Sequence, residues 1–178
     1  MLKAEQNLRI AMRDHLLYAN LGVVGAVCYF ALSEHGVIHA LLVIPWACFI
    51  LGWTYLCNGE KVSDIRKYLA EDITPYLTQS NVGVIGPVLA WETQHRSGAH
   101  RLRYKLIQLA VDLTAFVLSG LTAIIVYFLS IDSWLWWHYV ALALSMSIMA
   151  LLSGEYIRHF ALDIRELRRF KTNAKSVD

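Results

Sequence analysis

Residues 106–131, LIQLAVDLTAFVLSGLTAIIVYFLSI, form the stretch of sequence that decides the fold. Asp112 is its only charged side chain, and the stretch is longer than the roughly 20 apolar residues that span a hydrocarbon core. Three other stretches have the same character, at 16–32, 37–57 and 134–157. Hydrophobic residues make up 57% of the chain, whereas a soluble domain has about 45–50%. The sequence therefore predicts an all-α polytopic membrane protein with four transmembrane helices.

The positive charges all lie on one side of these stretches. The turns 33–36 and 132–133 carry Glu34 and Asp132 but no Lys or Arg. Short loops rich in Lys and Arg stay in the cytoplasm, so we expect both termini and the central loop there, in a bacterial inner (plasma) membrane. The 16 Lys and Arg residues are Lys3, Arg9, Arg13, Lys61, Arg66, Lys67, Arg96, Arg101, Arg103, Lys105, Arg158, Arg165, Arg168, Arg169, Lys171 and Lys175.

The chain divides into four segments on this basis. Residues 1–57 hold an N-terminal amphipathic helix and the first transmembrane hairpin, and residues 58–105 form a cytoplasmic helical loop. Residues 106–157 form the second transmembrane hairpin, and residues 158–178 form a cytoplasmic C-terminal helix and tail. The amphipathic part of the first segment, residues 2–15, either lies at the membrane interface or extends the first span.

The central loop contains two distinct features. Apolar residues from Val62 to Tyr76 recur every three or four positions, which predicts an amphipathic helix that ends near Pro75 and can continue the second span. Residues 81–91 are too few to span a membrane and too apolar for a solvated linker. We therefore expect this segment to be buried against a helix, a second subunit or the headgroup layer.

The fourth helix is expected to continue past the membrane. Apolar residues from Ile157 to Leu167 follow the 3-4-3 spacing of a helix–helix seam. A helix from His138 to Lys171 would be about 50 Å long, against a hydrocarbon core of about 30 Å. The projecting part would form either a short coiled coil or a surface that packs on the central loop.

Two acidic side chains within the spans are candidate functional groups. Asp112 and Glu155 each lie within about two turns of the cytoplasmic end of a span, where an ionisable group faces the bundle interior or a water-filled cavity. One interpretation is a salt bridge that pins the bundle, to Arg158 or Arg103. A second is a ring of carboxylates at the inner mouth of an oligomeric pore, which would favour cations. Protonation relays and simple snorkelling are the remaining interpretations.

Asn20 and Ser119 complete the set of intramembrane polar candidates. An Asn in a span is expected to hydrogen-bond to a neighbouring helix. Asp112, Ala115, Ser119 and Ala123 share one helix face, and small residues at this spacing let helices approach closely. Asp112 is therefore predicted to point into a helix–helix contact and not into lipid.

The cytoplasmic Lys and Arg residues form a candidate surface for lipid headgroups or another anionic ligand. Candidate ligands other than membrane lipids are a nucleotide, a nucleic acid and an acidic protein. The residues of this predicted surface are Arg96, Arg101, Arg103, Lys105, Arg165, Arg168 and Arg169.

The sequence contains no nucleophile elbow, phosphate loop or HExxH motif. Glu92 and His95 lie one helical turn apart, and His100 and Glu155 are possible additions, but metal sites in helix bundles need two Glu-x-x-His pairs. The 3 cysteines fall inside the predicted spans without metal-ligand spacing. We therefore expect neither an enzyme nor a metal or cofactor site.

The layout of four spans with cytoplasmic helices resembles the small membrane effectors of bacterial antiphage defence systems, such as those of the Hailong and Kiwa types. The stretch 91–96, WETQHR, is also similar to one in bacterial four-span membrane proteins. The resemblance implies an oligomeric channel that a cytoplasmic ligand opens or holds closed, and that depolarises the cell.

Two functions are predicted. The first is a homo-oligomeric membrane channel or pore-forming effector gated from the cytoplasmic side, acting in antiphage defence. The alternative is a non-conducting membrane anchor that recruits a cytoplasmic partner through residues 59–105 and the tail.

Overall fold

The computed structural model describes residues 2–34, 36–68, 100–131 and 133–175. Within these ranges the chain is helical and contains no strand. The helices are α1 (Leu2–Leu32), α2 (Val43–Tyr68), α5 (His100–Asp112), α6 (Ser119–Leu129) and α7 (Trp136–Lys175). A short 3₁₀ helix, η1 (Ile38–Leu42), leads into α2, and a π-helical segment, η3 (Leu113–Leu118), joins α5 to α6.

The four predicted transmembrane helices are confirmed in number and position. Helices long and apolar enough to cross a membrane cover Ala4–Leu32, Ile38–Ile65, Arg103–Leu129 and Trp136–Leu162. Each of these helices contains one of the predicted stretches, apart from a few residues at the ends of that stretch. The first, second and fourth helices also extend at least one turn beyond the predicted stretch, toward a terminus or the central loop. The chain is thus built as a multi-pass membrane protein.

Three helices run past the expected limits of the spans. Helix α1 is continuous from Leu2, so residues 2–15 extend the first span and are not a separate helix. Helix α2 continues without a break to Tyr68, and α7 continues to Lys175. The end of the amphipathic loop helix, the apolar segment 81–91 and the pair Glu92 and His95 lie outside the described residues.

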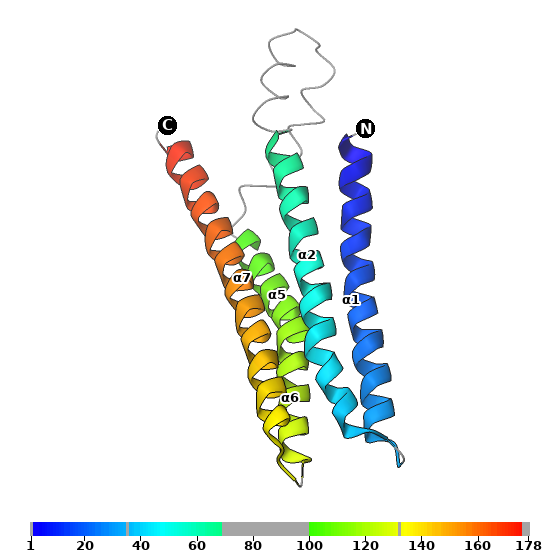
Figure 1. Ribbon diagram of the computed structural model, residues 1–178. Helices are drawn as coiled ribbons and strands as arrows, with labels where there is room; N and C mark the ends of the chain where they lie inside the picture. The colour runs from blue at the N-terminus through cyan, green and yellow to red at the C-terminus, as the bar shows by residue number, and fades with distance from the viewer. Residues whose placement is uncertain (1, 35, 69–99, 132, 176–178) are drawn as a thin grey trace.

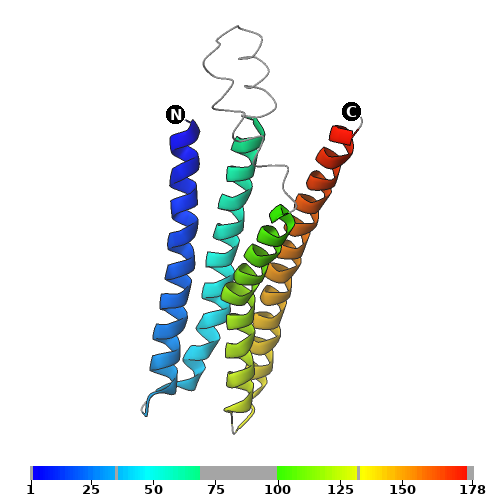
Figure 2. The same ribbon diagram turned by 180° about the vertical axis from the view of Figure 1, so that it is seen from behind.

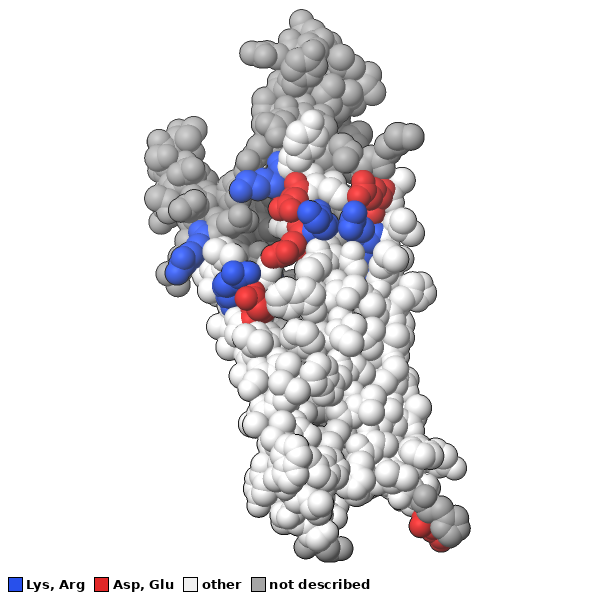
Figure 3. Space-filling view, viewed as in Figure 1, with Lys and Arg blue, Asp and Glu red and all other residues white. Residues whose placement is uncertain are grey.

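Figures 1 and 2 show an antiparallel bundle in which α1 and α2 form one hairpin, and α5–α6 and α7 form the other. Helix α2 packs against α1, α6 and α7. Both termini lie at one end, which we name the charged end. Figure 3 shows that the described Lys and Arg side chains on this face gather in a band toward this end with most of the acidic ones, above a long uncharged surface. An acidic side chain is visible at the opposite end, where Glu34 lies in the turn after α1. By the positive-inside rule the charged end is the predicted cytoplasmic end.

Large apolar side chains cover the outside of the bundle as well as its core. Leu21, Ile50, Ile125 and Leu151, from four different helices, are each more than half exposed. Contiguous apolar surface of this extent does not occur on water-soluble monomers. This surface is suited to contact with lipid or with a second membrane subunit.

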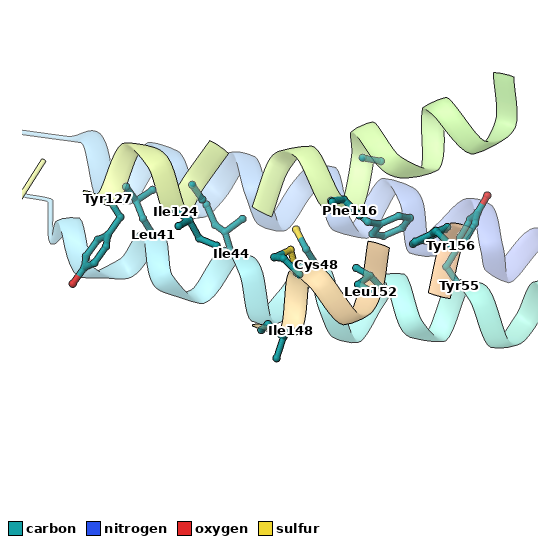
Figure 4. Packing of buried hydrophobic residues seen from close by; sticks show 14 of the residues in the cluster. Leu41, Ile44, Cys48, Tyr55, Phe116, Ile124, Tyr127, Ile148, Leu152 and Tyr156 are labelled. Atoms are coloured by element: carbon teal, nitrogen blue, oxygen red, sulfur yellow. The ribbon is translucent and has the colours of Figure 1, made fainter. Parts of the chain in front are cut away.

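The core forms where the two hairpins meet, and Figure 4 shows it as a row of apolar side chains from Tyr127 to Tyr55. Gly52 allows a close approach in this row. A Cβ atom at Gly52 would lie 3.1 Å from Leu152 Cδ2 and 3.3 Å from Phe116 Cβ. The missing side chain therefore lets α2 contact η3 and α7 at once.

Substituting Gly52 should weaken the bundle. Gly52→Val places two methyl groups against Leu152 and Phe116, and overpacking of this kind costs about 1–3 kcal/mol. The matched control is Gly154→Val, because a side chain at Gly154 meets nothing within 4 Å. Unfolding in mixed detergent–SDS micelles, followed by circular dichroism, compares the two free energies. Equal stability of both variants would refute close packing at Gly52.

Candidate functional site

A polar cleft of about 520 Å³ opens into the bundle near its charged end. Helices α1, α2, α5 and α7 all contribute to its walls. The cleft has a buried inner part and an exposed outer part. The inner part is lined by Arg13, Tyr55, Asp112 and Tyr156, and the polar lining further out is Glu60, Lys61, Asp64, Lys105, Gln108 and His159.

Three side chains from three helices meet in the inner part. Arg13 Nη2 donates a hydrogen bond to the Tyr55 hydroxyl at 2.7 Å, and the Arg13 guanidinium carbon lies 4.3 Å from the Tyr55 ring centre. Both groups also interact electrostatically with the Asp112 carboxylate. We name Arg13, Tyr55 and Asp112 the inner triad. A cation stacked on an aromatic face and a nearby carboxylate stabilise each other most when water is excluded.

Asp112 is nearly enclosed, with 7% of its surface exposed. Among the described residues, neither Asp112 Oδ1 nor Arg13 Nε has a hydrogen-bond partner. Buried polar atoms in native proteins nearly always have a partner, which is often an ordered water or a ligand. The inner part of the cleft can therefore hold an ordered water or a small polar ligand beside the Asp112 carboxylate.

The backbone next to Asp112 has an unusual local geometry. The π-helical segment η3 starts at Leu113, directly after Asp112. Within it, the Ala115 carbonyl accepts hydrogen bonds from Asn20 Nδ2 and Ser119 Oγ, both at 2.6 Å. Single π-helical turns inside α-helices are frequent at functional sites because they re-aim the side chains around them.

Phe116 packs against the two tyrosines that line the inner part of the cleft. This side chain is fully buried, 5.3 Å from the Tyr55 ring and 6.3 Å from the Tyr156 ring. Leu152, also fully buried, lies on the same level. We name Phe116 and Leu152 the plug, because they separate the cleft from the polar groups deeper in the bundle.

A close contact between His159 and Glu60 joins two helices at the outer part of the cleft. His159 Nε2 on α7 lies 2.6 Å from Glu60 Oε1 on α2. Both residues line the cleft and both remain partly exposed, His159 at 27% and Glu60 at 45% of their side-chain surface. The contact ties the two helices that also carry Tyr55 and Tyr156, so its rupture would allow the inner cleft to widen.

The structure separates the two acidic residues that the sequence grouped. Asp112 lines the cleft, whereas Glu155 pairs with Arg158 on its own helix at 2.8 Å. Arg158 is therefore engaged elsewhere, and the cation that acts on Asp112 is Arg13. Asp112 faces the interior of its own bundle, which does not favour the interpretation of a carboxylate ring around an oligomer axis.

The remaining predicted residues are placed as follows. Asn20 and Ser119 are brought together at the Ala115 carbonyl, as an inter-helix polar contact. Lys105 lines the cleft, while Arg103 and Arg165 are exposed. Arg96 and the side chains of Arg101, Arg168 and Arg169 lie outside the described part of the chain.

Sequence reasoning missed Arg13, Tyr55 and Tyr156 as members of the site. Arg13 was assigned only to topology, although it precedes Asn20 by seven residues and so shares its helix face. That spacing was the available signal. The two tyrosines carry no such signal, because aromatic residues inside a span are common core residues.

Comparison of the chain with protein-family models, with characterised proteins and with solved structures finds no match. The functional argument therefore depends on the geometry of this chain.

Removing Arg13 should leave the buried carboxylate without its cation. We expect Arg13→Met to lower the free energy of unfolding by about 1.5–3 kcal/mol, the usual worth of a hydrogen bond to a charged group, because the Tyr55 hydroxyl loses its donor and Asp112 its nearby cation. Asp112→Asn in the Arg13→Met background should restore part of that loss, because the neutral amide needs no counter-charge. Unfolding in detergent–SDS micelles measures both changes.

Arg9→Met is the control for this prediction. Arg9 lies one turn from Arg13, pairs with Glu5 at 2.7 Å on α1 itself, and reaches Asn58 Oδ1 on α2 only through a long hydrogen bond of 3.5 Å. Pairs of this kind contribute only about 0.3–0.5 kcal/mol. If Arg13→Met costs no more than Arg9→Met, the inner triad does not hold the bundle together.

Proposed function

We propose that the protein is a membrane channel gated from the cytoplasmic side, with the cleft as its inner mouth. The observation that carries this proposal is the Asp112 carboxylate, enclosed near the blind end of an open cleft with one oxygen unpartnered among the described residues. Ionisable groups at membrane depth are expensive and mark ion or substrate pathways.

The plug is the proposed gate of this channel. Hydrophobic constrictions close pores because water leaves a narrow apolar passage. The Phe116 ring contacts two tyrosines from different helices, tilted against Tyr55 on α2 and nearly parallel to Tyr156 on α7. A relative movement of these helices would shift both neighbours of Phe116 and open the passage.

The outer part of the cleft is the proposed site at which a cytoplasmic ligand opens the gate. Glu60 and His159 join α2 to α7 beside Lys61 and Arg13. An anionic ligand attracted by the two cations would compete with Glu60 for His159 and so release the contact. Control from the cytoplasm follows from the predicted orientation of the charged end.

The homo-oligomer remains a prediction, supported by the exposed apolar side chains along the outside of the bundle. The bacterial inner membrane and a role in antiphage defence likewise remain predictions, the second based on the resemblance in layout alone.

A second candidate is a non-conducting anchor that recruits a cytoplasmic partner. The extension of α7 favours it, because the span ends at Leu162 while the helix continues to Lys175. The additional turns would offer a protein-binding surface beyond the membrane. A channel and a recruiting surface differ in whether the purified protein alone conducts.

Ion flux in liposomes tests the channel. We expect purified protein to carry cations, and Phe116→Val to raise the flux about tenfold, equivalent to lowering the barrier by about 1.4 kcal/mol. Asp112→Asn should reduce the flux. Glu155→Gln is the matched control for charge loss, because Glu155 pairs locally with Arg158 outside the cleft.

Fluorescent indicators for Na⁺, K⁺ and H⁺ inside the vesicles report the flux, and size-exclusion chromatography checks that each variant is folded. Absence of flux for all three ions in both wild type and Phe116→Val would reject the channel and leave the anchor.

A further inference from the structure

We propose that the conducted species is the proton, and that it crosses within one subunit along a file of buried polar groups from Asp112 to His138. This inference rests on the proposed channel function. Along the helices from Asp112 to the level of His138 the file is about 20 Å long, which is most of a hydrocarbon core.

The first station past the plug consists of Asn20, Ser119 and Cys48. Asn20 is fully buried, and its Oδ1 atom has no hydrogen-bond partner within the described chain. Cys48 Sγ lies 3.3 Å from Ser119 Oγ, and Ser119 and Asn20 meet at the Ala115 carbonyl. Three helices thus place an amide, a hydroxyl and a thiol side by side in the core.

The second station is Ser145 on α7. Its surface is only 1% exposed, and its Oγ atom also lacks a partner among the residues described. Ser145 lies one turn from Met149, the residue that a side chain at Gly120 would strike. It lies two turns from His138. Its level is therefore between the first station and the far end of the bundle.

The third station is at the far end, where His138, Tyr127 and His39 gather. His138 Nδ1 accepts a hydrogen bond from the Leu135 amide at 3.1 Å, while Nε2 is buried with no partner in the described ranges. The His138 ring stacks on the His39 ring with centres 5.5 Å apart. His39 is 3.1 Å from the Tyr127 hydroxyl and reaches the surface, so it ends the file.

The buried side-chain atoms that lack a hydrogen-bond partner lie along the proposed file. The buried side-chain atoms without partners in the described chain belong to Asp112, Asn20, Ser145 and His138, together with Arg13 beside Asp112. They occupy successive levels of one bundle instead of being scattered. A water molecule beside each would supply the missing partner, which is how buried polar groups without protein partners are usually satisfied.

The width of the file favours the proton over a metal cation. The polar groups alternate with packed apolar side chains such as Ile44, Ile124 and Leu152, all nearly or fully buried. A hydrated Na⁺ or K⁺ needs a continuous wide passage, whereas a proton needs only a chain of hydrogen bonds. At each hop the bond from the proton to one oxygen, nitrogen or sulfur breaks as the bond to the next forms, and reorientation of the intervening hydroxyls and waters then restores the starting arrangement.

Proton flux in liposomes, with a pH-sensitive dye inside and a K⁺ diffusion potential as driving force, tests the file. We expect the wild type or Phe116→Val to carry protons, and Ser145→Ala and Asn20→Leu, made in the conducting background, to reduce the flux at least tenfold. Ser147→Ala is the matched control, because Ser147 lies on the same helix with its exposed hydroxyl bonded to the Ala143 carbonyl at 2.8 Å. It should leave the flux unchanged.

Four results would overturn the inference. Conduction of Na⁺ or K⁺ without protons rejects the proton file while the channel stands. Proton flux that Ser145→Ala and Asn20→Leu leave intact, in variants that elute as folded protein, shows that these groups only pack the helices. Flux that disappears when vesicles hold at most one subunit assigns the path to an oligomer axis. Absence of flux for every ion rejects both the channel and the file.

Discussion

The contact between Arg13, Tyr55 and Asp112 is the interaction on which the rest of the structure depends. It brings a cation from α1, a hydroxyl from α2 and a carboxylate from α5 to one point within the membrane-spanning part of the bundle. In lipid the hydrophobic effect does not drive helices together, because lipid tails are as apolar as the side chains. Polar contacts and close packing must therefore fix which helix faces which.

Close packing follows from this contact. With α1, α2 and α5 tied near the charged end, Gly52 lies against Phe116 and Leu152, and α7 is drawn into the same layer. The π-helical segment after Asp112 adjusts the register so that the Ala115 carbonyl meets Asn20. Polar bonds and van der Waals contact thus specify the same arrangement.

The bundle has two different ends joined by a core that is not purely apolar. The charged end holds an open cleft with a buried carboxylate, and the far end holds a cluster of imidazole and aromatic rings. Between them lie an amide, hydroxyls and a thiol at intervals of a few turns. An entirely apolar core would pack as well without desolvating polar groups, so their presence along one axis favours a role in transport over a role in packing alone.

The sequence by itself determined the number of spans, their alternation and the end at which the charges lie, because a span needs only length and apolar composition. It also identified Asp112, Asn20 and Ser119 as interior groups. The partners of these groups were decided only by tertiary structure. Arg13 and Tyr55 meet Asp112 because helix rotation and register are fixed by contacts between residues far apart in the chain, which no local periodicity records. The pair of Glu155 and Arg158, three residues apart on α7, was by contrast available from local helix spacing.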